Sequence, residues 1–539
     1  MAFGTEMPAM NKFLTSSLCA VMAATLAAQA SPPDLIARIH FAGAEKISAD
    51  TNSAAFTNFF CSAEARALRN QMLNKLSRFP YAWFKNRIAG TNDGAAQLRP
   101  LLDDLFQSEW LLEIRDTANG APESALAIRL NTDRAQLWQN NIAGVLQSWT
   151  RLAPEKTSNG WLMKKDLPPN LVRFERRGDW VVIDCGQNEL LLGDEILKPL
   201  VKTGTAAMET NWLTVDLDWP RLARWFAPLK EFDFPKVELQ FVGRDGNLWS
   251  KGKFILAQPL PQLEKWRMPT NVIHQPFVSF MAVRDIGPWL ERQSWARPYA
   301  IQPLPDQFFV WALPGIPLQT FIAAPVPDAR AALVQLDAKL SPIFNADSQK
   351  LFTPVTIVLT NNEIDWHGMP FADPFVRTWH EPAGDFLFGG FFPNTPRSQP
   401  LPPELFQQLN KPNVVYYQWE MTGERLKELP PLTQLMLLIT RYKQLDPNSA
   451  AHNWLNHIQP ALGPGVTVLT QTGPNELNFL RKSRCGLTAI ELMAIGNWLE
   501  APNFPGCDLR IPQPSPRLRQ SHIPGAPVRP APAPPMPPH

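Results

Sequence analysis

Four carboxylates in the second half of the chain have the types and spacing closest to a catalytic set. Glu363 and Asp365 lie in one polar segment, and Glu381 and Asp385 lie in a second polar segment nearby. Two carboxylates that flank a glycosidic bond can act as the acid and the base of its hydrolysis. One hypothesis is therefore a hydrolase of polysaccharide or cell-wall material, with a site around Glu363–Asp385.

The same two segments also have a purely structural interpretation. Asn361-Asn362 is typical of a turn, and residues 363–367 alternate polar and apolar side chains as a half-buried strand does. Glu381 begins another turn. Trp366 and Trp379 could serve as sugar platforms, but tryptophans at such positions are also ordinary core residues.

Several common signatures of catalysis or cofactor binding are missing from the sequence. It contains no H-E-x-x-H, G-x-S-x-G, Walker A or G-x-G-x-x-G motif. His367 and His380 have no identifiable third ligand, so we predict neither a metal nor another cofactor. With 51 basic and 49 acidic residues and a net charge of +2, the chain gives no sign of a nucleic-acid partner.

The N-terminus resembles a secretory signal peptide. Asn11-Lys12 is followed by an apolar run over residues 13–27 and by Ala28-Gln29-Ala30, an A-x-A cleavage signal. We expect residues 1–30 to be removed and the mature protein to be exported, to the periplasm or to the cell surface and beyond. No later stretch is long and apolar enough to predict a membrane span.

Four cysteines follow the predicted cleavage site: Cys61, Cys185, Cys485 and Cys507. In an oxidising compartment they allow three disulfide connectivities. Cys485 and Cys507 form the favoured pair because they are close in sequence and flank one predicted helix. The alternative is that all four are free and pack as small apolar side chains.

A short unit recurs along the body of the chain. A strand is followed by a helix-capping residue, an Arg three positions later and a large apolar residue seven positions later, which should turn back onto the sheet. The three copies are Asn131/Arg134/Trp138, Asp218/Arg221/Trp225 and Thr422/Arg425/Leu429. We expect each Arg to extend toward solvent or to pair with a carboxylate.

The remaining patterns predict an α+β fold of two lobes, each an antiparallel sheet with packed helices. The 55 prolines favour short elements, and turns such as Arg244-Asp245-Gly246-Asn247 predict hairpins. Ser62 is a predicted N-cap, and Thr488-x-x-Glu491 is a predicted capping box at the start of a helix. The predicted lobes span residues 31–268 and 269–510. Eleven of the final 29 residues, 511–539, are proline, which predicts a disordered or polyproline II tail. Its arginines could contact an anionic wall polymer or membrane surface.

Two segments of the C-terminal lobe, Glu381–Pro393 and Gly486–Leu492, resemble stretches of large uncharacterised secreted proteins of Verrucomicrobia-like Gram-negative bacteria. The resemblance implies an exported or envelope location. It implies no activity and no functional residue.

Three functions remain open from the sequence. The favoured one is an exported, non-enzymatic binding or scaffolding protein that engages an unknown envelope component. The alternatives are the hydrolase described above and a carrier that holds an apolar ligand between the two lobes.

Overall fold

The architecture is known from a computed structural model. It describes residues 34–85, 88, 90–117, 121–165, 170–187, 189–203, 211–225, 234–273, 277–292, 300–314, 319–347, 355–368, 372–392, 407–429 and 448–506. Within these ranges the chain is α+β, with helices packed on an antiparallel sheet, as the sequence predicts. The predicted signal peptide (1–30), Cys507 and the proline-rich tail (511–539) lie outside the described residues.

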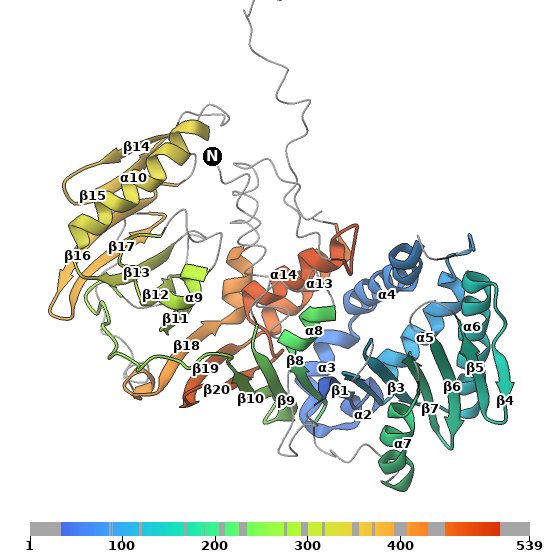
Figure 1. Cartoon of the computed structure of the whole chain (residues 1–539). Helices are drawn as coiled ribbons and strands as arrows, with labels where there is room; N and C mark the ends of the chain where they lie inside the picture. The colour runs from blue at the N-terminus through green and yellow to red at the C-terminus, as the bar shows by residue number, and fades with distance from the viewer. Residues whose placement is uncertain are drawn as a thin grey trace, which may run out of the picture.

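Within the described residues, 20 antiparallel strands form one continuous sheet (Figure 1). The strands of its N-terminal half are β1 (Leu35–Phe41), β2 (Trp110–Arg115), β3 (Glu123–Arg129), β4 (Glu155–Thr157), β5 (Gly160–Lys164), β6 (Leu171–Arg177), β7 (Trp180–Gly186), β8 (Leu213–Asp218), β9 (Lys236–Arg244) and β10 (Asn247–Ile255). Those of its C-terminal half are β11 (Ser279–Arg284), β12 (Gln307–Ala312), β13 (Thr320–Val326), β14 (Thr356–Leu359), β15 (Glu363–His367), β16 (Phe375–Glu381), β17 (Gly384–Gly390), β18 (Val414–Met421), β19 (Pro464–Gly473) and β20 (Glu476–Ser483).

The two halves have the same strand order. From one end of the sheet the order is β4-β5-β6-β7-β3-β2-β1-β8-β9-β10. From the other end it is β14-β15-β16-β17-β13-β12-β11-β18-β19-β20. The innermost strands, β10 and β20, pair with each other, so the two halves meet edge to edge.

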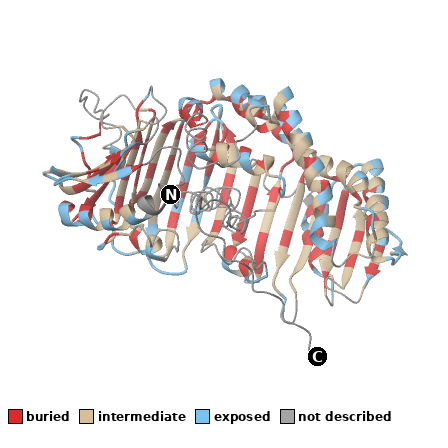
Figure 2. Ribbon diagram, turned by 90° about the horizontal axis from the view of Figure 1, so that it is seen from above, coloured by how far each residue is buried: buried red, intermediate tan, exposed pale blue. Residues whose placement is uncertain are grey.

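The predicted division near residue 268 falls between β10 and β11, but the sheet does not stop there. Figure 2 shows the strands side by side along the long axis of the molecule. We call the β10–β20 pairing, residues 248–255 with 476–483, the central joint.

Helices cover the sheet in separate groups. They are α2 (Ala44–Ala49), α3 (Ala54–Cys61), α4 (Ala63–Phe84), α5 (Ala95–Gln107), α6 (Thr132–Thr150), α7 (Leu192–Thr203), α8 (Trp219–Trp225), α9 (Gly287–Arg292), α10 (Ala329–Asp347), α13 (Ala450–Ile458) and α14 (Ala489–Glu500). Residues 422–429 form a further helical segment.

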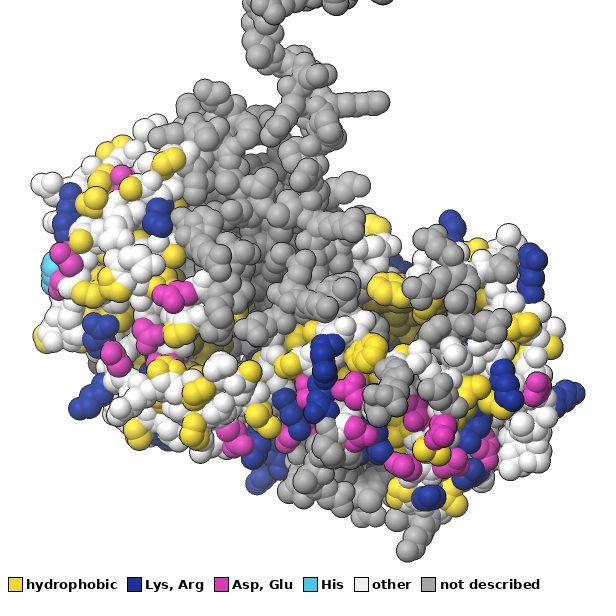
Figure 3. Space-filling view, in the orientation of Figure 1, with side chains coloured by type: hydrophobic (Ala, Val, Ile, Leu, Met, Phe, Trp, Pro, Cys, Tyr) yellow, Lys and Arg dark blue, Asp and Glu magenta, His cyan; other side chains and the backbone are white. Residues whose placement is uncertain are grey.

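In the N-terminal half, helices pack on both faces of the sheet. Ile128 of β3 lies in a core with α5 and α6, whereas its neighbour Ala127 packs against α7 on the opposite face, as the alternation of a strand requires. Figure 3 shows basic and acidic side chains intermingled over the lower part of this half. The ion pairs Arg115–Glu195 and Arg177–Asp194 fasten α7 to β2 and β6.

Toward the middle of the sheet, elements from both ends of the chain share one core. Trp454 of α13 and Leu492 of α14 pack with Leu68 of α4, and the indole of Trp454 donates to the carbonyl of Phe59 at 2.9 Å. In the C-terminal half, α10 covers β14–β17. No described helix is long and apolar enough to cross a membrane.

Local turn and cap signals in the sequence are confirmed. β9 and β10 are joined by Asp245-Gly246, whose φ values of 51° and 67° suit the type I′ turn of a two-residue hairpin. Ser62 caps α4 by accepting from Ala65 N at 3.0 Å. Thr488 and Glu491 form the predicted capping box at the start of α14.

The side chain expected to turn back onto the sheet is buried in two of the three copies of the strand–cap–helix unit and exposed in the third. Trp138 and Leu429 are buried, whereas Trp225 is 43% exposed. Helix α8 has only seven residues, so Trp225 lies at its end, where its indole donates to Asp116 at the surface. The three arginines of the unit pair with carboxylates, in the pairs Arg134–Asp104, Arg221–Asp218 and Arg425–Glu428.

Candidate functional site

A buried polar network surrounds Arg481, beside the central joint. Arg481 belongs to β20 and lies opposite Ser250 of β10. Its guanidinium donates to both oxygens of Glu491 in α14, at 2.8 and 3.1 Å, and to Thr467 of β19 at 2.9 Å. Arg481 is 5% exposed and Glu491 is 6% exposed.

This geometry is what a buried ion pair needs to be tolerated. Removing two charges from water is costly unless the pair is bidentate and the remaining polar groups are satisfied. Arg481 also donates to the carbonyl of Gly486, and Glu491 accepts from Thr488 N at 2.8 Å. Although burial lowers the pKa of Arg481, the charge of Glu491 raises it above its ordinary value.

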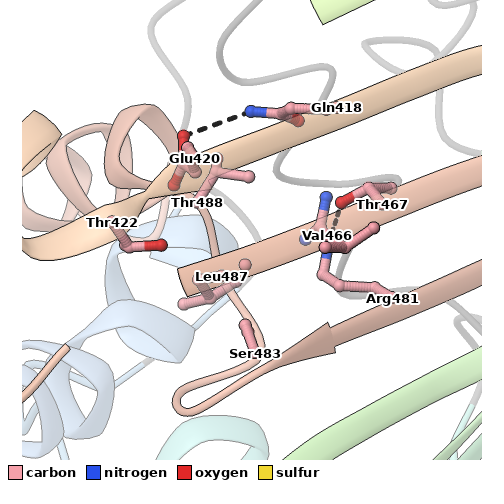
Figure 4. A pocket seen from close by; sticks show the side chains of 10 residues that line it. Gln418, Glu420, Thr422, Val466, Thr467, Arg481, Ser483, Leu487 and Thr488 are labelled. Carbon is pink, nitrogen blue, oxygen red and sulfur yellow. Dashed lines mark hydrogen bonds between the residues drawn. The ribbon is translucent and has the colours of Figure 1, made fainter. Parts of the chain in front are cut away.

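A second carboxylate, Glu420 of β18, anchors the first turn of α14. Its Oε1 accepts from Ala489 N at 2.8 Å, and its Oε2 accepts from the Gln418 side chain at 3.2 Å. A helix N-terminus has unpaired N–H groups and a partial positive charge, so it favours a carboxylate there. Burial raises the pKa of Glu420. Figure 4 shows Glu420, Thr467 and Arg481 on three neighbouring strands, with Thr488 at the start of the helix beside Glu420.

Two small cavities adjoin the network. One, of about 10 Å³, is lined by Glu420, Thr467 and Arg481 among others. The other, of about 40 Å³, lies between Arg481, Ser250 and the apolar side chains of β9 and β10. One water needs roughly 10–15 Å³ and an organic ligand roughly 300–1,000 Å³. These cavities therefore have the size of a few waters.

The four carboxylates proposed from the sequence are found as two separate pairs. Glu363 and Asp365 are two residues apart on β15 and project from the same face. Partial burial, and then the neighbouring Asp365, raise the pKa of Glu363. Glu363 lies opposite Arg377, and Glu381 is four residues further along β16, which corresponds to about 13 Å.

Glu381 and Asp385 are held at the β16–β17 turn by structural contacts. Glu381 accepts from Asn271 N and from the Trp379 indole, both at 2.9 Å. Asp385 bonds to His380 at 2.6 Å on the surface. The structure thus keeps Glu381 and Asp385 apart from Glu363 and Asp365.

Of the two interpretations of Trp366, a sugar platform or an ordinary core residue, the structure supports the core residue. Its side chain is 6% exposed and packs in the core beneath α10, because it alternates with Asp365 on β15 and faces inward. Trp379 is half-buried against a neighbouring core. In the parts of the chain that the structure describes, no group of three His, Cys, Asp or Glu side chains is arranged to hold a metal ion.

Cys61, Cys185 and Cys485, the cysteines within the described ranges, form no disulfide with one another. Cys485 is buried, and burial raises its pKa to about 12. Cys507 lies outside the described residues, so its pairing with Cys485 stays a prediction.

A carboxylate pair that the sequence analysis missed lies where β11 ends and β12 begins. Burial, and then the charge of Asp306, raise the pKa of Asp285 to about 7. Asp285 has a φ of 57°, and Asp306 accepts from Gly287 N at 3.3 Å at the start of α9. The pair depends on the β11–β12 pairing of residues far apart in sequence, which no local motif reveals.

The Arg481 network was also missed, although a signal for it exists. The inward-facing positions of β20 are Leu477, Phe479, Arg481 and Ser483. A charged arginine therefore occupies a position at which the alternation of the strand predicts a buried side chain. The capping box already places Glu491 at a helix start. What the sequence does not give is that these two elements meet.

No family model matches the chain, and a search of curated proteins also gave no match. Among solved structures, the di-domain ARO/CYC StfQ from the steffimycin biosynthetic pathway is similar over 56% of this chain and 74% of that chain, at 12% identity and a TM-score of 0.07. A similarity of this degree carries no argument about fold or function.

Proposed function

We propose that the protein is an exported, non-enzymatic binding or scaffolding protein of the bacterial envelope. The observation that carries this proposal is the central joint, where β10 and β20 unite two halves of equal strand order in one sheet. The buried Arg481–Glu491 pair fastens α14 to this joint. A long sheet that is fixed at its middle provides an extended platform on which an envelope component can be bound or positioned.

Three glutamates whose side chains hold the backbone in place support the same proposal. Glu420, Glu491 and Glu381 each accept from a backbone N–H that fixes a helix start or a loop. Carboxylates used in this way stabilise the architecture and have fewer lone pairs left for a substrate.

The equal strand order further supports an internal duplication of a ten-strand unit. In this interpretation Asn131 before α6 and Asp328 before α10 are counterparts, since each accepts from a backbone N–H three residues later. They follow β3 and β13, which hold equivalent places in the two halves.

One observation favours the hydrolase as a second candidate. Partial burial raises the pKa of Glu363 beside Asp365, and a carboxylic acid with a raised pKa can act as the general acid of glycoside hydrolysis. The site would then consist of Glu363 and Asp365 alone, because Glu381 and Asp385 lie apart.

Binding to the envelope tests the favoured proposal. Mature chain, residues 31–539, is mixed with a total envelope preparation of the source bacterium, and the bound fraction is measured by sedimentation over a range of protein concentrations. We expect saturable binding that Glu363→Gln leaves unchanged, as does Asp373→Asn, a matched loss of charge at an exposed neighbouring residue. Sedimentation equal to that of the protein without envelope would contradict the proposal.

Export is tested separately. The N-terminal residue of the protein isolated from native cells should be Ser31, because the A-x-A signal ends at Ala30. Recovery of a chain that still carries residues 11–30 would show that the predicted cleavage is wrong.

A further inference from the structure

The 20-stranded sheet has two ends, β4 and β14. Within the described residues each of these strands is paired on one side only. An edge strand presents unpaired N–H and C=O groups, so it can pair with another strand unless the chain protects it. Figure 1 shows β14 at one end of the sheet, next to α10.

The two edges differ in how they are protected. β4 has three residues, all exposed, and two of them, Glu155 and Lys156, are charged. β14 has the sequence Thr356-Ile357-Val358-Leu359 and carries no charge. The Val358 side chain is 38% exposed. Shortness and charge are the usual protection of an edge strand, and β14 lacks the charge.

The register of β14 shows which of its backbone groups point outward. Thr360 N donates to Glu363 O at 2.8 Å, and Val358 lies opposite Asp365. Hydrogen bonding alternates along an antiparallel strand, so residues 356, 358 and 360 bond toward β15. The N–H and C=O groups of Ile357 and Leu359 therefore point away from the sheet.

Helix α10 adds an apolar side chain at the same edge. Arg330 donates to the carbonyl of Thr360 at 2.8 Å, which places this side of the helix beside the end of β14. Val334 is one turn further along the same side of α10 and is 43% exposed. Two exposed valines, Val334 and Val358, thus accompany the unpaired backbone groups.

We propose that the β14 edge is a self-association site, at which a second copy of this chain pairs antiparallel through its own β14. A two-fold axis through Val358 places Ile357 of each copy opposite Leu359 of the other. Each of these two residue pairs exchanges two backbone hydrogen bonds, so the contact has four in total. An uncharged strand brings no like-charge repulsion to such pairing. The chain already joins its two halves in this manner, edge to edge at the central joint.

The contact is small, so the dimer is weak. Four residues of strand and one side of a helix bury less surface than the roughly 1,200 Å² of a stable interface. We expect a dissociation constant in the micromolar range or above. This corresponds to a binding free energy of about 8 kcal/mol or less in magnitude. An envelope surface that concentrates the protein favours the dimer by mass action.

Site-specific cross-linking tests the register. In the mature chain carrying Cys61→Ser, Val358→Cys should form a covalent dimer on oxidation with diamide, because the two copies of this residue face each other about 4.5 Å apart at Cα. Thr356→Cys is the matched control on the same exposed face. Its two copies would lie about 14 Å apart, so it should cross-link no more than the parent. Equal cross-linking of the two variants would overturn the proposed pairing.

Sedimentation velocity tests the association itself. The sedimentation coefficient of the mature chain should rise with concentration, and Val358→Lys should abolish the rise while leaving the melting temperature unchanged. Thr157→Lys, an equivalent change on β4, should leave the rise intact. A chain that is monomeric up to several hundred micromolar, or a Val358→Lys variant that still associates, would refute the proposal.

Discussion

Breaking the Arg481–Glu491 pair should destabilise the protein substantially. Arg481→Met removes one buried charge and retains most of the side-chain volume, which leaves Glu491 without its cation. Loss of one partner of a buried ion pair typically costs about 3–5 kcal/mol. In this variant Glu491 still accepts from Thr488 N and still lies at the start of α14, where the helix dipole favours a carboxylate. We therefore expect the free energy of unfolding to fall by the low end of this range, about 3 kcal/mol.

A double-mutant cycle measures the interaction free energy between Arg481 and Glu491. Urea unfolding of the wild type, Arg481→Met, Glu491→Gln and the double variant is followed by intrinsic fluorescence of the 19 tryptophans. The loss of unfolding free energy in the double variant should be smaller than the sum of the losses in the two single variants, by at least about 1 kcal/mol. Lys251→Met, an exposed change on the neighbouring strand β10, is the control and should shift stability by less than about 0.5 kcal/mol. Additive losses, or single losses no larger than that of the control, would refute the assigned role of the pair.

Three further outcomes follow. The folded-state pKa of Asp285, about 7, is above that of an unfolded Asp, so its contribution favours folding at low pH and is lost as pH rises from about 4 to 7. Asp285→Asn should flatten the pH dependence of the melting temperature in this window, and an unchanged profile would contradict the raised pKa. Thr488→Ala should cost about 1 kcal/mol in urea unfolding because it removes the cap of α14, whereas Thr488→Ser should restore most of it. Deletion of residues 511–539 should leave the melting temperature unchanged, and a drop of several degrees would show that the tail packs on the body.

The sequence predicts those features whose signals are local. The Asp245-Gly246 turn needs positive φ at two adjacent residues, and the Thr488–Glu491 capping box needs only residues within one helical turn. Strand 363–367 follows from alternation within five residues. Each of these was predicted because neighbours in the chain determine it.

The features that were missed depend on contacts between distant residues. The pairing of β10 with β20 joins segments more than 200 residues apart, so the single sheet could not be read from two separately patterned lobes. Trp225 was expected to be buried because its spacing matches that of Trp138, but α8 ends at that residue. The four candidate carboxylates were close in sequence, and the geometry of β16 separated them.

The most direct test of the central claim, binding without turnover, is the release of soluble fragments from envelope material. Purified sacculi and envelope polysaccharide are incubated with the mature chain, and soluble products are analysed by mass spectrometry beside a Glu363→Gln/Asp365→Asn double variant. We predict that the wild type and the double variant give the same products as heat-denatured protein. Saccharide or peptide fragments that appear with the wild type and are lost in the double variant would contradict the account and establish a hydrolase.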